Sequence, residues 1–417
     1  MSEHFDDFDD LSELDDDQLE HVQAALERGE NQIALDLAEV YLEEHPLDVE
    51  ALNYCAVAAS NLGDQVKAMA LYRKALRFDP GNGALHHNFG VLLERLGRYD
   101  EAYHHFWRSL ELQPDFPEAY VNLGNVLDEM GRTSEALQMY QRALRRMPNS
   151  ADIYYNIGYA LNRIGHHGEA LGFFDRALQL KPDDAASLNG RGYALAGLQR
   201  DEEALVWYER AIAAMEMPNY HYNRGLSLQR LERSDDALAA FDRALELAPD
   251  FFEALIERAL LHIERGDYPV AQQDLDRAED LDPGRTEPLF YRSMLLERQG
   301  RLEEALQEIE RCLQIDPAFG MARNNRGNLL LKLGRLDEAL ACFDALLAES
   351  AQLAVVHYNR ACVMARKRKV REAVRSLARA IEQDPVFLRE AHSDPDFDAI
   401  RKRPSFRALL ERYEQAT

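Results

Sequence analysis

PEAYVNLGNVLDEMGRTSEALQMYQRALRRMPNS, residues 117–150, is one complete copy of a pattern that recurs along the chain about every 34 residues. Its most regular member is an alanine, which recurs eleven times with a single step of 33 residues: Ala34, Ala68, Ala102, Ala136, Ala170, Ala204, Ala237, Ala271, Ala305, Ala339 and Ala373. A recurrence of this length and regularity indicates that one structural unit is repeated eleven times.

The chemistry of the repeat indicates a helical hairpin. We number each repeat so that the recurrent alanine is position 20; the repeats then begin at residues 15, 49, 83, 117, 151, 185, 218, 252, 286, 320 and 354, and the last ends at 387. Gly124 at position 8 interrupts a helical pattern at a cost of about 1 kcal/mol, so we expect close helix packing there, with the small residue at position 20 facing it. Gly131 at position 15 can adopt the left-handed conformation that ends a helix, and Pro148 at position 32 stops the second helix.

This pattern resembles the tetratricopeptide repeat family. Residues 117–150 match the family pattern almost position by position, and the resemblance covers 373 of the 417 residues. It implies an all-α fold: a right-handed superhelical solenoid of stacked helix–turn–helix hairpins, with a C-terminal capping helix. Stacking buries the surface that a single hairpin cannot bury.

Three segments are expected. Residues 1–14 form an acidic arm, since residues 1–20 contain ten acidic residues and no lysine or arginine; the arm is predicted to be disordered, and the alternative is an acidic motif that docks on a basic surface. Residues 15–387 form the eleven repeats. The boundaries 217/218 and 353/354 are candidate bends between groups of repeats; the alternative is that the repeat pattern varies there without a bend. Residues 388–417 resemble the tail that closes many bacterial tetratricopeptide arrays and are predicted to be a helical cap.

The composition and net charge argue against several classes of protein function. The net charge of −26 argues against binding to nucleic acid or to anionic membranes. No apolar run is long enough to span a bilayer, the first residues lack the features of a secretory signal, and the four cysteines form no C-x-x-C pair. We therefore expect a cytoplasmic protein. Residues 351–417 contain 14 basic and 9 acidic residues, and the basic cluster 366–369 is a candidate seat for the acidic arm.

The candidate binding residues follow from the family resemblance, in which positions 2, 5, 6, 9, 12 and 13 line a concave wall. Asparagines stand at positions 6 and 9: Asn88, Asn122, Asn125, Asn156, Asn223, Asn325, Asn328 and Asn359. Basic residues stand at position 13: Arg95, Arg163, Arg230, Arg298, Lys332 and Arg366. A carboxamide both donates and accepts hydrogen bonds and can pair with a peptide backbone, while arginine can hold a carboxylate.

The asparagine series resembles the ladder of the O-linked N-acetylglucosamine transferases, which grips extended protein segments. Gly190, Glu257 and Tyr291 interrupt it here, which favours two shorter stations in repeats 3–5 and 10–11. The alternative is that the asparagines at position 6 simply satisfy neighbouring backbone groups.

No catalytic or cofactor motif is found. His86, His87, His104 and His105 lack a further ligand at a recognised spacing, so no metal site or cofactor is expected. The sequence predicts a non-catalytic protein–protein interaction scaffold or adaptor that binds extended peptide or protein segments in its concave groove. The alternatives are a regulatory subunit of an enzyme, of the transferase or phosphatase type, and a scaffold that self-associates head to tail.

Overall fold

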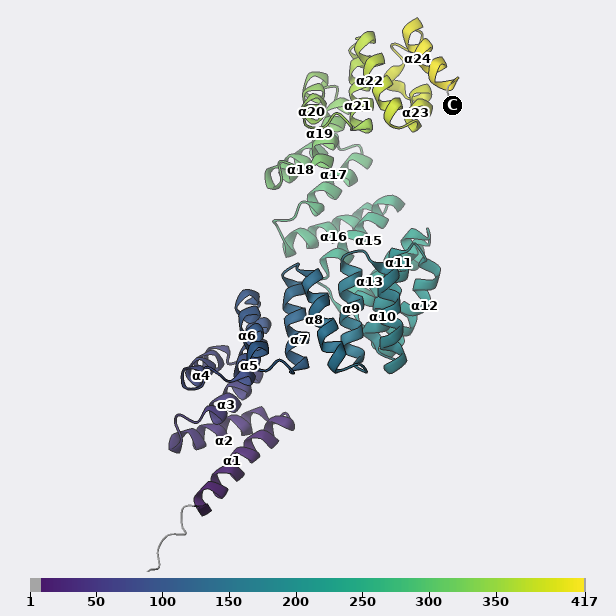
Figure 1. Ribbon diagram of the computed structural model, residues 1–417. Helices are drawn as coiled ribbons and strands as arrows, with labels where there is room; N and C mark the ends of the chain where they lie inside the picture. Colours follow the sequence, from purple (N-terminus) through teal and green to yellow (C-terminus); the bar gives the residue numbers. More distant parts are fainter. Residues whose placement is uncertain (1–8, 416–417) are drawn as a thin grey trace, which may run out of the picture. The chain divides into compact units, whose positions relative to one another are not determined.

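The molecule is built from α-helices that follow one another as antiparallel pairs. The structure, a computed structural model, describes the backbone of residues 9–415 and side chains from Gln18 onward (Figure 1). Over these residues the regular elements are 24 α-helices and one short 3₁₀ turn, and no strand is present. The predicted all-α class and the hairpin repeat are therefore confirmed.

Each repeat contributes a first and a second helix. The first helices are α1 (Asp9–Glu27), α3 (Val49–Asn61), α5 (Gly83–Arg95), α7 (Pro117–Glu129), α9 (Ala151–Arg163), α11 (Ala185–Gly197), α13 (Pro218–Arg230), α15 (Phe252–Arg265), α17 (Glu287–Arg298), α19 (Gly320–Lys332) and α21 (Ala354–Arg366). The second helices are α2 (Asn31–Glu44), α4 (Gln65–Phe78), α6 (Tyr99–Leu112), α8 (Thr133–Arg146), α10 (His167–Leu180), α12 (Asp201–Ala214), α14 (Ser234–Leu247), α16 (Tyr268–Leu281), α18 (Leu302–Ile315), α20 (Leu336–Glu349) and α22 (Val370–Gln383).

The chain forms two compact halves, Met1–Glu216 and Met217–Thr417. The division falls one residue before the irregular repeat boundary at 217/218, whereas 353/354 lies inside the second half. At the N-terminus, helix α1 begins at Asp9 and therefore overlaps the segment 1–14 that we expected to be disordered. Residues 1–8 of that segment lie outside the described residues.

The glycine at position 8 leaves space for an aromatic ring at position 24. We had expected the alanine at position 20 to face this glycine. A Cβ atom placed on Gly158 would lie 2.9–3.1 Å from ring atoms of Phe174, which is at position 24 of the same hairpin. Equivalent glycine–aromatic contacts occur in Gly90–Phe106, Gly124–Tyr140, Gly192–Tyr208, Gly225–Phe241 and Gly327–Phe343. The alanine at position 20 is fully buried in every repeat, but the ring fills the space that the missing side chain leaves.

The turn inside each hairpin needs one residue with positive φ at position 15. Eight repeats place glycine there, with φ between 69° and 85°. The other three place Gln199, Glu232 and Arg368 in the same conformation, with φ of 60°, 59° and 57°. A side chain in this region is strained, because the Cβ atom approaches the backbone oxygen.

We therefore expect Glu232→Gly and Arg368→Gly to raise the free energy of unfolding by roughly 0.5–1 kcal/mol each, the strain relieved being partly offset by the freedom that glycine adds to the unfolded chain. Urea unfolding followed by circular dichroism measures this. Gly63→Ala, which introduces the same strain at φ 85° in open space, is the matched control and should lower stability. Destabilisation by both glycine variants would contradict the explanation.

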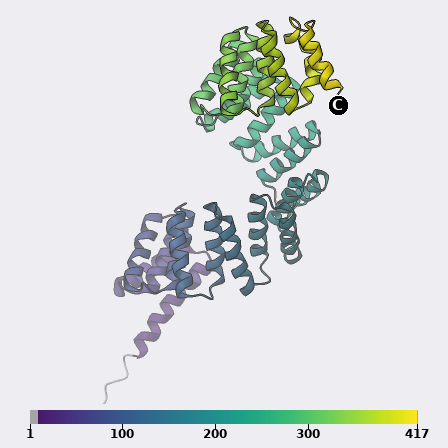
Figure 2. The same cartoon turned by 45° about the horizontal axis from the view of Figure 1, so that its top comes forward.

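The second half ends in a cap. It consists of α23 (Val386–Ser393), the 3₁₀ turn η1 (Pro395–Phe397) and α24 (Pro404–Glu414), and α24 packs beside α22 (Figure 2). Phe397 and Phe406 are fully buried, and their ring centroids lie 5.4 Å apart. The cap therefore extends the hydrophobic core beyond the last repeat.

Candidate functional site: a groove along the first helices of repeats 9–11

A groove of about 460 Å³ lies against the first helices α17, α19 and α21. Its apolar lining comes from Phe290, Met294, Met321 and Val355, which stand at positions 5, 9 and 2 of their repeats. These are positions that the sequence assigned to the concave wall. Met321 is 62% exposed and Val355 46% exposed, so apolar surface is offered directly to solvent.

Asn325 lines the same groove and has an unusual environment. Its Nδ2 atom is buried and has no hydrogen-bond partner. The neighbouring amide of Asn359 donates to Oδ1 of Asn324 at 3.0 Å. Leaving a buried donor unpaired costs about 1–3 kcal/mol, so Asn325 is the amide in this station that would gain most from a bound acceptor.

The asparagines at position 6 of repeats 3–5 each contact the preceding first helix, as Asn359 does. Asn88 donates to Oδ1 of Asn53 at 3.0 Å, and Asn122 contacts Nε2 of His87 at 2.9 Å. Burial lowers the pKa of His87, which keeps the imidazole neutral and able to accept this hydrogen bond.

In repeat 5, Asn156 donates to Oδ1 of Asn125 at 3.3 Å, an atom that also accepts from Tyr140 Oη at 2.9 Å. Asn223 also has interacting neighbours, and Asn328 is half-buried on α19. These amides thus have partners within the protein, but the partners are side chains and not the backbone groups of the alternative interpretation.

The basic residues at position 13 also join successive repeats. Arg163 Nη1 donates to Oδ2 of Asp128 at 2.9 Å, and Arg366 Nη1 donates to the carbonyl oxygen of Leu331 at 2.6 Å. Arg95 reaches Asn61 at 3.4 Å, Lys332 pairs with Glu297, and Arg230 contacts Ser227 within its own helix. Arg298 is exposed at the end of α17.

A second basic row escaped the sequence analysis. Arginine occupies position 7 of six consecutive repeats, in place of the apolar residue of repeats 3–5: Arg191, Arg224, Arg258, Arg292, Arg326 and Arg360. Arg258 shows the arrangement most fully, since it contacts Asp242 in the preceding repeat at 2.6 Å and Asp274 in its own hairpin at 2.6 Å. Each acid lies 16 residues from the arginine, so the 34-residue spacing of the row was the signal that could have revealed it.

Models of the tetratricopeptide repeat family match most of the chain. One matches residues 19–83, 121–185, 174–216, 222–286 and 256–318, a second matches 82–149, and a third matches 296–361. The chain belongs to the tetratricopeptide repeat family. Its repeats form a protein-interaction scaffold of the general type that this family provides.

Several solved tetratricopeptide structures are similar to this array. YrrB, described as having "an unusual peptide-binding site", is 25% identical, covers 44% of this chain and 95% of its own, and has a TM-score of 0.37. TTC0263 from Thermus thermophilus is 27% identical, covers 43% and 98%, and has a TM-score of 0.39. The anaphase-promoting-complex assembly Cut9–Hcn1 is 14% identical, covers 94% of both chains and has a TM-score of 0.49. A search of curated proteins found no significant match.

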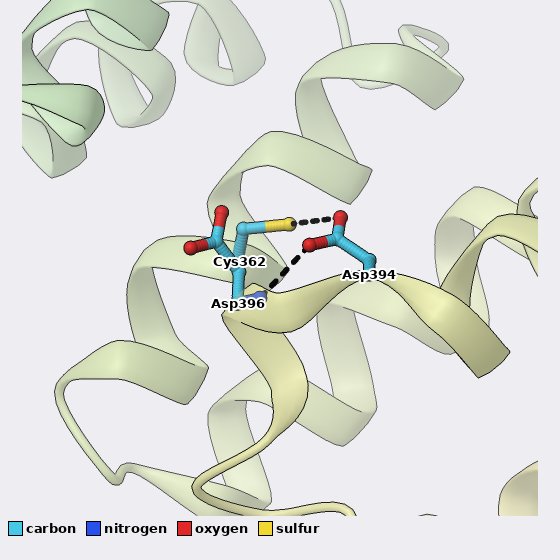
Figure 3. A group of neighbouring side chains, drawn as sticks. All are labelled: Cys362, Asp394 and Asp396. Carbon is cyan, nitrogen blue, oxygen red and sulfur yellow. Dashed lines mark hydrogen bonds between the residues drawn. The ribbon is translucent and has the colours of Figure 1, made fainter.

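Two groups of side chains in the tetratricopeptide array contain residue types that can bind metal ions. His86 Nδ1 and His105 Nδ1 lie 2.9 Å apart, and burial together with the charge of His86 lowers the pKa of His105 to about 4. Among the residues that the structure describes, one group of three potential metal ligands comes together: Cys362, Asp394 and Asp396 (Figure 3).

The contacts within this group are those of a structural clasp. Asp394 Oδ2 accepts hydrogen bonds from Tyr358 Oη at 2.7 Å and from Cys362 Sγ at 3.7 Å. Asp394 Oδ1 accepts from the backbone amide of Asp396 at 2.9 Å (Figure 3). Burial, and then the nearby carboxylates, raise the pKa of Cys362 above its usual range, so the thiol stays protonated and donates. The group fastens the cap to the last repeat.

The helices of the tetratricopeptide array are short and carry charged residues. Across the described part of the chain, none is both long and apolar enough to cross a bilayer.

Proposed function

We propose that the chain is a non-catalytic scaffold that binds an extended peptide or protein segment in the groove of α17, α19 and α21. The observation that carries this proposal is the buried, unpartnered Nδ2 of Asn325 beside an exposed apolar lining. An extended segment supplies a hydrogen-bond acceptor for the amide and an apolar side chain for the lining. Its carbonyl groups accept hydrogen bonds, and an apolar side chain fills the groove.

Charge and thiol chemistry agree with this proposal. Both Lys332 and Arg298 stand at position 13, at the ends of α19 and α17, where a carboxylate of a bound segment could reach them. Cys55, Cys312, Cys342 and Cys362 are free thiols, which supports the proposed cytoplasmic setting, where thiols stay reduced.

The test begins with peptides selected from a random display library on the full chain, whose dissociation constants are then measured by fluorescence anisotropy. Met321→Glu places a charge on the apolar lining, and we expect it to weaken binding at least about tenfold. Asn325→Ala removes one donor, and we expect a loss of about fivefold, corresponding to about 1 kcal/mol. Val66→Glu, at an apolar residue that is 77% exposed outside the groove, should leave binding unchanged.

A stability measurement separates binding from structure. If Asn325 serves the fold, Asn325→Ala will lower the free energy of unfolding. If it serves a ligand, the same change removes a buried unpaired donor, and unfolding in urea should show stability that is unchanged or higher. Unchanged dissociation constants in both groove variants would refute the proposed site.

A further inference from the structure

The cap already places an acidic segment on the concave positions of repeat 11. Asp394 accepts hydrogen bonds from Tyr358 at position 5 and from Cys362 at position 9. Asp396 lies 3.8 Å from Arg366 at position 13. Helix α21 therefore holds carboxylates at positions 5, 9 and 13, and positions 5 and 9 line the open groove two repeats earlier.

Apolar side chains anchor this segment. Phe397 is fully buried, with its ring edge-on to Tyr358 at 5.7 Å between centroids, and Ile400 is 1% exposed. The segment 396–400 reads DFDAI: two carboxylates flank an aromatic anchor, and an aliphatic anchor follows.

The same order of residue types occurs at one other place in the sequence. The segment 7–11 reads DFDDL, with Phe8 and Leu11 in the places of Phe397 and Ile400. No further D-F-D-x-[IL] segment exists among the 417 residues. The N-terminus thus repeats Asp396, which lies near Arg366, and the two apolar anchors that follow it, whereas Asp394 has Phe5 as its counterpart and Asp398 pairs with Arg401.

The open groove complements this chemistry. Phe290, Met294 and Met321 offer apolar surface for an aromatic and an aliphatic side chain. Lys332 occupies the position that Arg366 has in repeat 11, and its side chain is 54% exposed even though it pairs with Glu297. Arg298 is an exposed cation at position 13 of the preceding repeat, next in the sequence to the lining residue Glu297.

We propose that the groove of α17, α19 and α21 binds the segment 7–11 of a second copy of the chain. Phe8 and Leu11 fill the apolar lining, and the flanking carboxylates of Asp7 and Asp9 pair with Lys332 and Arg298. The proposal rests on the groove of the proposed function and names its occupant. Because the two surfaces differ, the contact is heterologous and joins copies head to tail.

Sedimentation of the full chain over a range of concentrations tests the proposal. We expect the average mass of the wild-type chain to rise with concentration up to roughly 100 µM, an affinity in the micromolar range, and to fall when salt screens the charges. Phe8→Ser with Leu11→Ser should leave a monomer, whereas Phe5→Ser, outside the segment, should associate as the wild type does. Wild-type chain that stays monomeric at every concentration would overturn the proposal.

A charge exchange makes the test specific to this contact. Arg298→Glu with Lys332→Glu should weaken association at least about tenfold, and adding Asp7→Lys with Asp9→Lys to the same chain should restore it. Restoration cannot arise from a folding defect, because the second pair of changes lies in the other half of the chain. Association that both sets of changes leave unaltered would also overturn the proposal.

A labelled peptide with the sequence of residues 1–14 separates this inference from the function on which it rests. It is titrated into full-length chain that carries Phe8→Ser and Leu11→Ser, with and without Met321→Glu. If library peptides bind in a Met321-dependent way and this peptide does not, the groove stands and the occupant is wrong. If Met321→Glu changes the binding of neither, both proposals fail.

Discussion

Arg292→Leu is expected to lower the free energy of unfolding of the second half by roughly 3–5 kcal/mol, the largest effect of any single change considered. The Arg292 side chain is 8% exposed and contacts Asp276 at 2.8 Å, Glu279 at 2.5 Å and Glu308 at 3.4 Å. Its removal leaves the three carboxylates without their most buried cation, although Arg311 still contacts Glu279 and Glu308. Urea unfolding at pH 7 measures the loss.

The exposed Arg301→Leu is the matched control. Arg301 pairs with Glu304 within one helical turn, and both side chains are 51% exposed, so we expect a change in stability far smaller than that of Arg292→Leu, because water screens an exposed pair. Equal effects of the two substitutions would show that burial does not determine the strength of the Arg292 contacts.

The same cluster should make stability depend on pH. Burial alone would raise the pKa of Glu279, but the guanidinium groups of Arg292 and Arg311 outweigh it and hold that pKa below its usual range. A carboxyl group with a lowered pKa stabilises the fold above its unfolded value of about 4.3 and loses that contribution as the pH falls through the folded value. We expect this part of the acid destabilisation to be smaller in Arg292→Leu, in which Arg311 alone still contacts Glu279.

Gly158→Ala and Gly172→Ala, two identical substitutions in one hairpin, should have opposite effects. A Cβ atom on Gly158 would meet the ring of Phe174, which is fully buried and cannot move aside, so we expect a loss of about 1–3 kcal/mol from overpacking. A Cβ atom on the exposed Gly172 of α10 would meet nothing within 4 Å. Because alanine favours the helix, we expect a gain of about 0.5–1 kcal/mol there.

Thermal unfolding of the two variants, each compared with the wild type, measures both effects. A stabilising Gly158→Ala would show that the ring at position 24 tolerates a larger neighbour, and the explanation of the recurring glycine would then fail.

The sequence predicted those features that depend on position within one repeat. Gly131 and Pro148 report the turn and the helix end directly, because backbone conformation is a local property. The residue that packs against the position-8 glycine was harder to predict, since it depends on the angle at which the two helices of a hairpin cross.

The contacts between repeats could not be predicted in the same way. Asn122 meets His87, 35 residues earlier, and this pairing depends on the rotation between adjacent first helices, which a repeat pattern does not encode. The contact of Asp394 with Tyr358 could not be predicted for another reason. The cap occurs once in the chain, so its residues cannot be compared with equivalent positions in other repeats. The groove at Asn325 depends on how successive first helices pack against one another, so it could be recognised only in the three-dimensional structure.

The arginines at position 7 have a consequence for folding fidelity. Hairpins of similar shape can stack in the wrong order, a characteristic error of repeat proteins. Arg258 and Arg360 each contact an acid at position 25 of the preceding hairpin, Asp242 and Asp344 respectively, whereas repeats 3 and 4 present Trp107 and Gln141 at that position. A hairpin stacked out of sequence against repeat 3 or 4 would leave its guanidinium without that carboxylate. We therefore expect the row of arginines to disfavour such incorrect neighbours while the chain folds.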